Sequence, residues 1–137
     1  MPCNLIILGK NLDIDAFIAK SKLRGYFKHY KGDPKYKSKP LGEKVTYSSV
    51  VAQTSKASSH NLEKQITDTI KYLKRHKEKL SLIKKTKEVQ YAMLDFGVAL
   101  RINNKQAAQF DRYPNSLLIL AGELGLDLHI SLYSIKK

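Results

Sequence analysis

Apolar residues recur along the chain with two different periods, which predict a mixture of strands and helices. Where apolar and polar residues alternate, or where a short apolar run lies beside a glycine, the pattern predicts a strand. Where apolar residues repeat every three or four positions, it predicts a helix with one buried stripe. In chain order the expected elements are a buried strand at 3–8, a short helix that begins after an N-cap at Asn11 or Asp13 and ends near Ser21, a strand or irregular aromatic segment at 26–31, a strand at 45–54, a helix at 61–85, a strand at 90–102, a helix at 114–124 that Gly125 ends, and a strand at 126–133.

The longest helical pattern covers residues 61–85 and predicts one long helix over the sheet. Glu63 in its first turn and Lys84 and Lys85 in its last turn agree with the helix dipole. His76 falls on the apolar stripe, where we expect it to pack against its neighbours rather than to bind a metal. The stripe steps by four and three positions and consists of Leu62, Ile66, Thr69, Leu73, His76, Leu80 and Ile83.

The order β-α-β-β-α-β, followed by a further α-β, predicts an α+β fold built as a two-layer sandwich. The first six elements match the split βαβ plan of ferredoxin-like domains, and the last helix and strand extend it. We expect a mixed or antiparallel sheet that is covered on one face by the 61–85 helix and the shorter helices. Because the chain has 137 residues and no internal repeat, residues 1–137 are expected to form a single domain.

Positive charge is concentrated in two segments of the chain. The formal net charge is +13, from 25 Lys and Arg against 12 Asp and Glu. Residues 20–44 carry a net charge of +7 and residues 63–88 a net charge of +5. A surface that gathers charge in this way is typical of a protein that meets an anionic partner.

Part of the first basic segment, residues 31–44, is rich in lysine, glycine, proline and serine; we call it the basic loop and expect it to be mobile. Cations and aromatic rings alternate from Arg24 into this loop. Nucleic-acid-binding proteins use that mixture to neutralise phosphates and to stack bases. The alternative is a solvated loop whose neighbours Tyr26, Phe27 and Tyr30 turn into the core.

The second basic segment belongs to the expected long helix. Lys74 and Glu78 are four positions apart, so part of its charge is paired locally. It is either the solvated face of that helix or a basic ridge beside the first basic segment, residues 20–44, that follows a phosphate backbone or an acidic protein. The residues that we expect to contact such a partner are Arg24, Lys28, Tyr30, Lys31, Lys35, Tyr36, Lys37, Lys39, Lys71, Lys74 and Arg75.

Few residues are arranged for catalysis or metal binding. Phosphate-binding, nucleophile-elbow and dinucleotide motifs are missing, Cys3 is the single cysteine, and the histidines have no ligand spacing. We therefore expect no enzyme, no metal and no cofactor. Asp95 and His129 share the less apolar faces of two expected strands with Tyr91 and Tyr133. If those strands pair, Asp95 could orient His129 as a general base, and a hydrolase-like reaction is a third hypothesis.

The chain contains no apolar run that approaches the roughly 20 residues needed to span a bilayer. Its start lacks the basic region and the long apolar region of a secretory signal. Together with the single cysteine, these features lead us to expect a cytoplasmic protein with no membrane partner.

Four stretches of the sequence resemble a family of small bacterial proteins called domain of unknown function 4279. They are an acidic helix start at 12–17, a Lys-Gly-Asp-Pro turn at 31–34, the beginning of the long amphipathic helix near Leu62, and the stretch 117–128 that leads into a strand ending at Tyr133. The resemblance covers nearly the whole chain and implies the same fold and a bacterial origin. It implies no activity. Related small bacterial proteins encoded beside toxins act as immunity proteins, which supplies an analogy only.

One position departs from the family pattern. The family tends to carry a tryptophan in the strand before the long helix, whereas this chain has none and Tyr47 takes that place. The strong positive charge is a second departure.

These features favour a non-catalytic binding protein for an acidic protein partner, because steered association would account for the two basic segments. The analogy above makes an immunity-type role one form of this hypothesis. The alternative is nucleic-acid binding by the same surface. A nucleic acid requires lysines along a groove with exposed rings, whereas a protein partner requires an apolar centre inside the charged patch. The sequence leaves the oligomeric state open, and a bare apolar sheet face would suggest a homodimer.

Overall fold

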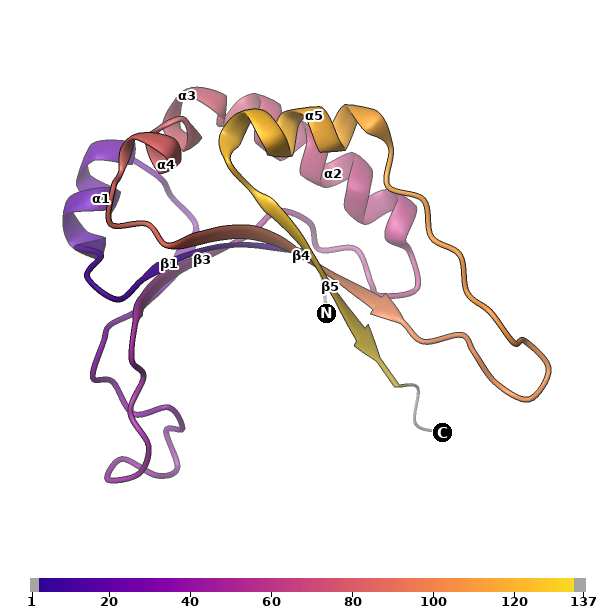
Figure 1. Cartoon of the computed structure of the whole chain (residues 1–137), viewed down its shortest axis with the longest axis horizontal. Helices are drawn as coiled ribbons and strands as arrows, with labels where there is room; N and C mark the ends of the chain where they lie inside the picture. The colour runs from indigo at the N-terminus through magenta and orange to yellow at the C-terminus, as the bar shows by residue number, and fades with distance from the viewer. Residues whose placement is uncertain (1–2, 135–137) are drawn as a thin grey trace.

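The computed structural model describes residues 3–134, which form a five-stranded sheet with helices packed on one side (Figure 1). We call that side the helix face and the other side the open face. The strands are β1 (Asn4–Gly9), β2 (Tyr26–His29), β3 (Ser48–Gln53), β4 (Tyr91–Ala99) and β5 (Asp127–Tyr133). The helices are α1 (Ile14–Ser21), α2 (Leu62–Arg75), α3 (Lys77–Leu80), α4 (Leu82–Lys85) and α5 (Asn115–Leu124).

The strands lie in the order β2-β3-β1-β4-β5, so the first strand of the chain is the central one. β1 is antiparallel to both β3 and β4, and β2 is antiparallel to β3. β5 is parallel to β4, because α5 carries the chain back across the helix face before β5 begins. The predicted α+β fold with a mixed sheet and one covered face is confirmed (Figure 1).

Alternate residues of the strands form the hydrophobic core under the helices. Leu5 and Ile7 of β1 are fully buried, as are Leu94 and Phe96 of β4. Residues on a strand alternate between the two faces of the sheet, so this burial fixes the helix face for every paired strand. The alternation predicted for residues 90–102 is confirmed from Tyr91 to Phe96, whereas every residue from Gly97 to Ala99, where β4 ends, is buried.

The prediction of one continuous helix over residues 61–85 is wrong. His76 separates α2 from α3, and Ser81 separates α3 from α4. The Ser81 hydroxyl donates a 2.5 Å hydrogen bond to the carbonyl of Glu78, a local bond that competes with regular helix geometry. The breaks let the chain change direction over the twisted sheet, while Leu73, Leu80 and Ile83 of the predicted stripe stay buried and His76 is half-buried.

A buried glutamine connects the two layers. Gln65 of α2 is fully buried, and its side-chain amide donates hydrogen bonds to the carbonyl of Gly97 on β4 at 2.8 Å and to that of Ser58 at 2.9 Å. The Gln65 side-chain oxygen has no hydrogen-bond partner among the described residues. The two hydrogen bonds from the Gln65 amide nitrogen set the position of α2 along β4, because a buried amide that lost these partners would destabilise the fold.

The ends of two helices follow the sequence signals. The Asp13 carboxylate accepts a 3.0 Å hydrogen bond from the amide of Ala16 and caps α1, which selects Asp13 over Asn11 as the N-cap. Gly125 ends α5 with a left-handed φ of 74°, a backbone conformation that favours glycine.

We predict that Leu73→Ala lowers the free energy of unfolding by about 2–5 kcal/mol, because it opens a cavity beneath α2. Urea denaturation followed by circular dichroism would measure the change. The neighbouring exposed residue supplies the control, since Lys74→Ala should stay within about 0.5 kcal/mol of the unaltered protein. Equal effects of the two substitutions would contradict the assignment of the helix faces.

We also predict that the Cys3 thiol resists labelling in the folded protein. Cys3 is fully buried, and burial is the main cause that raises its pKa to about 11, so the reactive thiolate is scarce at pH 8. A chromogenic disulfide reagent at pH 8 should react with the thiol only in denaturant. Rapid stoichiometric reaction without denaturant would show that the segment before β1 opens readily.

Candidate functional site

The open face of the sheet has an apolar centre. Ile6 of β1 lies between Val51 of β3 and Met93 of β4 in the pairing register, so these three side chains are neighbours on one surface. They are half-buried rather than buried, because the helices lie on the opposite side. The residues 3–8 were predicted to be a buried strand, and the structure buries only alternate ones on the helix face.

This apolar centre is the floor of a concave site of about 410 Å³ that we call the sheet hollow. One wall comes from the chain that enters and leaves the basic loop, and the opposite wall from β4 and β5. Polar groups therefore surround an aliphatic floor. The lining residues are Ile6, Leu8, His29, Lys35, Val45, Tyr47, Ser49, Val51, Met93, Asp95 and His129.

The basic loop connects β2 to β3 and extends beyond the open face (Figure 1). Its two ends are held together, since Gly32 donates to the carbonyl of Val45 and Val45 donates to that of Asp33, each at 2.8 Å. Lys35 donates through its backbone to Glu43 at 2.9 Å. These bonds fix the direction in which the loop leaves the sheet, while its mobility stays a prediction.

Two of the predicted partner-binding residues contact the protein itself. The Lys28 ammonium lies 2.9 Å from the Asp15 carboxylate of α1, and the Tyr30 hydroxyl donates to the same oxygen at 2.8 Å. Hydrogen bonds from Lys28 and then Tyr30 lower the pKa of Asp15, and hydrogen bonds with Tyr30 and then Asp15 raise the pKa of Lys28. Lys28 of β2 and Tyr30, which follows that strand, thus link this edge of the sheet to α1. Because both side chains already contact Asp15, less of their charge and hydrogen-bonding capacity is free for a partner.

The other predicted residues divide between the two sides of the sheet. Lys31, Lys35, Lys37, Lys39 and Tyr36 lie in the basic loop on the open-face side, and they are exposed. Lys35 also makes an exposed ion pair with Glu43 at 3.5 Å. The exposed Arg24 lies between α1 and β2.

The α2 residues Lys71, Lys74 and Arg75 are exposed on the helix layer. The α2 residues and the basic loop therefore lie on opposite sides of the sheet, and α2 does not form a ridge beside that loop (Figure 1). The two basic segments do meet on the helix side, where Lys20 of α1 and Lys85 of α4 line one hollow. α2 and the basic loop lie apart because the apolar stripe of α2 packs on the helix face, whereas the β2–β3 connection leaves on the open-face side.

The expected meeting of Asp95 and His129 does occur. β4 and β5 pair with these two residues in register, and the His129 Nδ1 atom lies 3.7 Å from the Asp95 carboxylate. The Ser131 hydroxyl donates to the same carboxylate oxygen at 2.7 Å. Asp95 thus stands between serine and histidine, whereas activation of a serine nucleophile needs the histidine in the middle. The arrangement orients a largely exposed imidazole at the rim of the sheet hollow.

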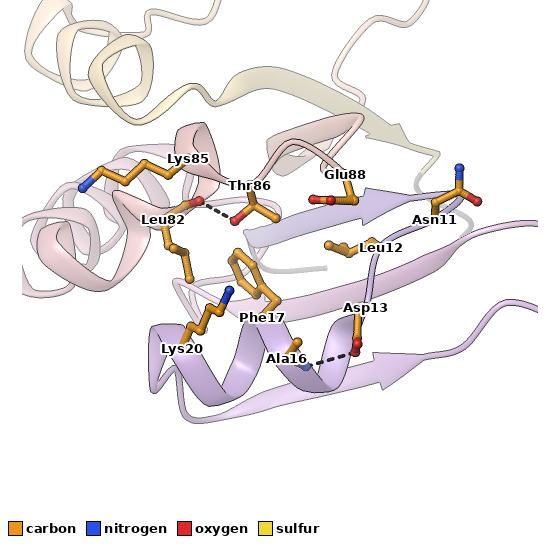
Figure 2. Close-up of a pocket in the computed structure, with 10 residues that line it drawn as sticks. All are labelled: Asn11, Leu12, Asp13, Ala16, Phe17, Lys20, Leu82, Lys85, Thr86 and Glu88. Carbon is orange, nitrogen blue, oxygen red and sulfur yellow. Dashed lines mark hydrogen bonds between the residues drawn. The ribbon is translucent and has the colours of Figure 1, made fainter.

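A second hollow, of about 280 Å³, lies between α1 and the segment that follows α4 (Figure 2). Phe17 and Leu82 lie within it, with Lys20 and Lys85 toward one end. Two of its polar side chains serve the local backbone: Asp13 caps α1, and Thr86 donates to the Leu82 carbonyl at 2.7 Å. It is better explained as the seam between two helices than as a binding site.

Within residues 3–134, no group of three or more His, Cys, Asp or Glu side chains is placed to hold a metal ion. In the same part of the chain, no helix is long and apolar enough to cross a membrane.

Sequence reasoning missed the apolar floor of the sheet hollow. It named lysines and tyrosines around the hollow but neither Met93 nor Val51. A signal was present, because residues 5–8 are apolar at every position, which places apolar side chains on both faces of that strand.

We predict that Asp15→Asn lowers the melting temperature near neutral pH, since the amide cannot pair with Lys28 as the carboxylate does. Folding lowers the pKa of Asp15. The carboxylate therefore stabilises the folded protein fully above the unfolded-state pKa, near 3.9, and this stabilisation is lost as the pH falls through the folded-state pKa. The difference between the two proteins should be constant from about pH 5 to 8 and disappear in more acidic solution. Thermal melts across that range would measure it, and a difference independent of pH would contradict a role for the charge.

Comparison with known proteins identifies the family of this chain but indicates no activity. No curated protein matches the chain, and no solved structure matches it. The family model described as domain of unknown function 4279 matches residues 1–135. The predicted resemblance is confirmed over almost the whole length, and the chain therefore belongs to the family of domain of unknown function 4279.

Proposed function

We propose that this protein is a non-catalytic binding protein for an acidic protein partner, and that the sheet hollow with the basic loop is its binding surface. The observation that carries the proposal is the aliphatic floor beside a lysine-rich loop. Interfaces between proteins are typically organised in this way, with an apolar centre that excludes water and a charged surround that steers association.

The position of the lysines supports an acidic ligand. Lys31, Lys37 and Lys39 extend beyond the open face, and Lys35 reaches the wall of the hollow. An acidic segment that placed an apolar side chain on Ile6 and Met93 would bring its carboxylates to these ammonium groups. The immunity-type role suggested by analogy is one form that such binding would take.

Nucleic-acid binding is the second candidate, and exposed rings favour it. Phe27 on β2 is 74% exposed, and Tyr91 and Tyr133 on β4 and β5 are exposed as well. A stacking platform on a sheet uses rings from its central strands, whereas here β1 and β3 present Ile6 and Val51. For this reason we place a protein ligand first.

We further propose that β1 to β4 with α1 and α2 form a ferredoxin-like split βαβ core. The support is that β3 lies between β1 and β2, and β1 lies between β3 and β4, each in antiparallel pairing. α5 and β5 would then be an extension at the β4 side.

Binding to defined probes tests the proposal. The first probe is a fluorescent peptide of alternating glutamate and leucine, the second is oligoglutamate of the same charge, and the third is a single-stranded oligothymidine. We expect the peptide with leucine to bind most tightly at about 150 mM salt, because only it uses both the apolar floor and the lysines.

Charge reversal of the basic loop provides the matched test. The triple substitution Lys35→Glu, Lys37→Glu and Lys39→Glu should weaken peptide binding at least roughly tenfold while the melting temperature changes by only a few degrees. The triple substitution Lys71→Glu, Lys74→Glu and Arg75→Glu changes the charge equally on the other side of the sheet. That control should retain most of the affinity. Equal losses would overturn the assigned surface, and submicromolar binding of oligothymidine alone would favour the second candidate.

A further inference from the structure

The outer edge of β5 is exposed and lacks the features that usually protect an edge strand. No strand of residues 3–134 pairs with this edge. β5 has seven residues and contains no proline and no lysine. The opposite edge strand, β2, has only four residues and includes Lys28. Short length and lysine commonly protect an edge against the addition of another strand. The β2 edge has both protections and the β5 edge has neither, so an added strand is expected at β5.

The backbone of β5 shows which residues would bond to an added strand. The carbonyl of Tyr133 accepts a 2.9 Å hydrogen bond from the amide of Leu100, so Tyr133 directs its backbone groups toward the β4 side. The N–H and C=O groups of one residue in a strand point to the same side, and successive residues alternate. It follows that Leu128, Ile130 and Leu132 direct their amides and carbonyls outward.

The side chains at this edge are apolar and exposed. Ile130 is 46% exposed and Leu132 is 59% exposed. Both alternate with His129 and Ser131, so they lie on the helix-face side of β5. Leu118 and Ile119 of α5, the helix that leads into β5, are also exposed.

The charge distribution favours a second copy of this chain as the occupant. Two copies that each carry a net charge of +13 repel one another over most of their surfaces. The stretch 113–134, which includes α5 and β5, has no lysine or arginine and contains Glu123 and Asp127. This edge is therefore a place where two copies can meet without bringing lysines together.

We propose that β5 pairs in antiparallel fashion with β5 of a second copy, around a two-fold axis at Ile130. In that register Ile130 faces its own counterpart, and Leu128 faces Leu132 of the other copy. The outward amides and carbonyls are satisfied, and the apolar side chains are covered by their equivalents. This proposal rests on the edge of the sheet and does not depend on the proposed function.

The pairing has a consequence for the open face. A two-fold axis perpendicular to the sheet puts the helices of both copies on one side and both open faces on the other. The two sheet hollows would then share one continuous surface, with the basic loops at its far ends.

Light scattering coupled to size-exclusion chromatography tests the proposal on the full chain. The expected mass is twice 15.6 kDa at the upper end of a dilution series spanning roughly 1–200 µM. Ile130→Lys should weaken dimerisation at least roughly tenfold, because it places like charges opposite one another on the axis. Phe27→Lys is the matched control, since it puts the same charge on an exposed apolar position of the other edge strand, and it should leave the mass unchanged.

Single cysteines test the register without relying on a destabilised variant. Residues facing each other in a hydrogen-bonded pair have Cα atoms about 5.5 Å apart, within the range of a disulfide. Ile130→Cys should therefore form a covalent dimer rapidly under mild oxidation. In Leu132→Cys the two thiols would be about four residues, or roughly 13 Å, apart and should not link. Cys3 is buried and should not compete.

Three results would overturn the proposal. The first is a mass of 15.6 kDa throughout the dilution series. The second is a dimer that Ile130→Lys leaves intact and Phe27→Lys disrupts, which would assign the contact to the other edge. The third is equal cross-linking of Ile130→Cys and Leu132→Cys, which would indicate random collision rather than a fixed register.

Discussion

The pairing of β1 with β3 on one side and β4 on the other places all of the remaining elements. Leu5 and Ile7 alternate with Ile6 and Leu8, so the central strand has an apolar residue on each face at every step. The helices cover the face of Leu5 and Ile7, where the chain gains the full hydrophobic stabilisation of buried side chains. The other face stays apolar at its centre and exposed.

This one-sided cover accounts for the separation of the α2 lysines from the basic loop. α2 has one apolar stripe, and burying it on the helix face directs Lys71 and Lys74 to solvent on that side. The connection from β2 to β3 is not covered and leaves on the open-face side, where Lys35 meets the sheet hollow. We expected the α2 lysines and the basic loop to form one basic surface. In the structure they lie on opposite sides of the sheet.

The two proposals concern different parts of the same sheet. The sheet hollow combines an aliphatic floor with lysines, which is the chemistry of a site for an acidic protein segment. The β5 edge combines unpaired backbone groups with apolar side chains and has no basic residues, which is the chemistry of self-association. Joined at β5, two copies would present two hollows to one partner, and avidity would then strengthen weak individual contacts.

The sequence by itself determined the order of most strands and helices, the alternation in the first part of β4 and the glycine end of α5, because each depends on neighbouring residues. Only the tertiary structure decided where the 61–85 helix breaks, which side carries each basic segment, and that Lys28 binds Asp15. It also brought His129 beside Asp95 and left the β5 edge open. Those features arise from contacts between segments far apart in the chain, whose register and facing the local pattern does not contain.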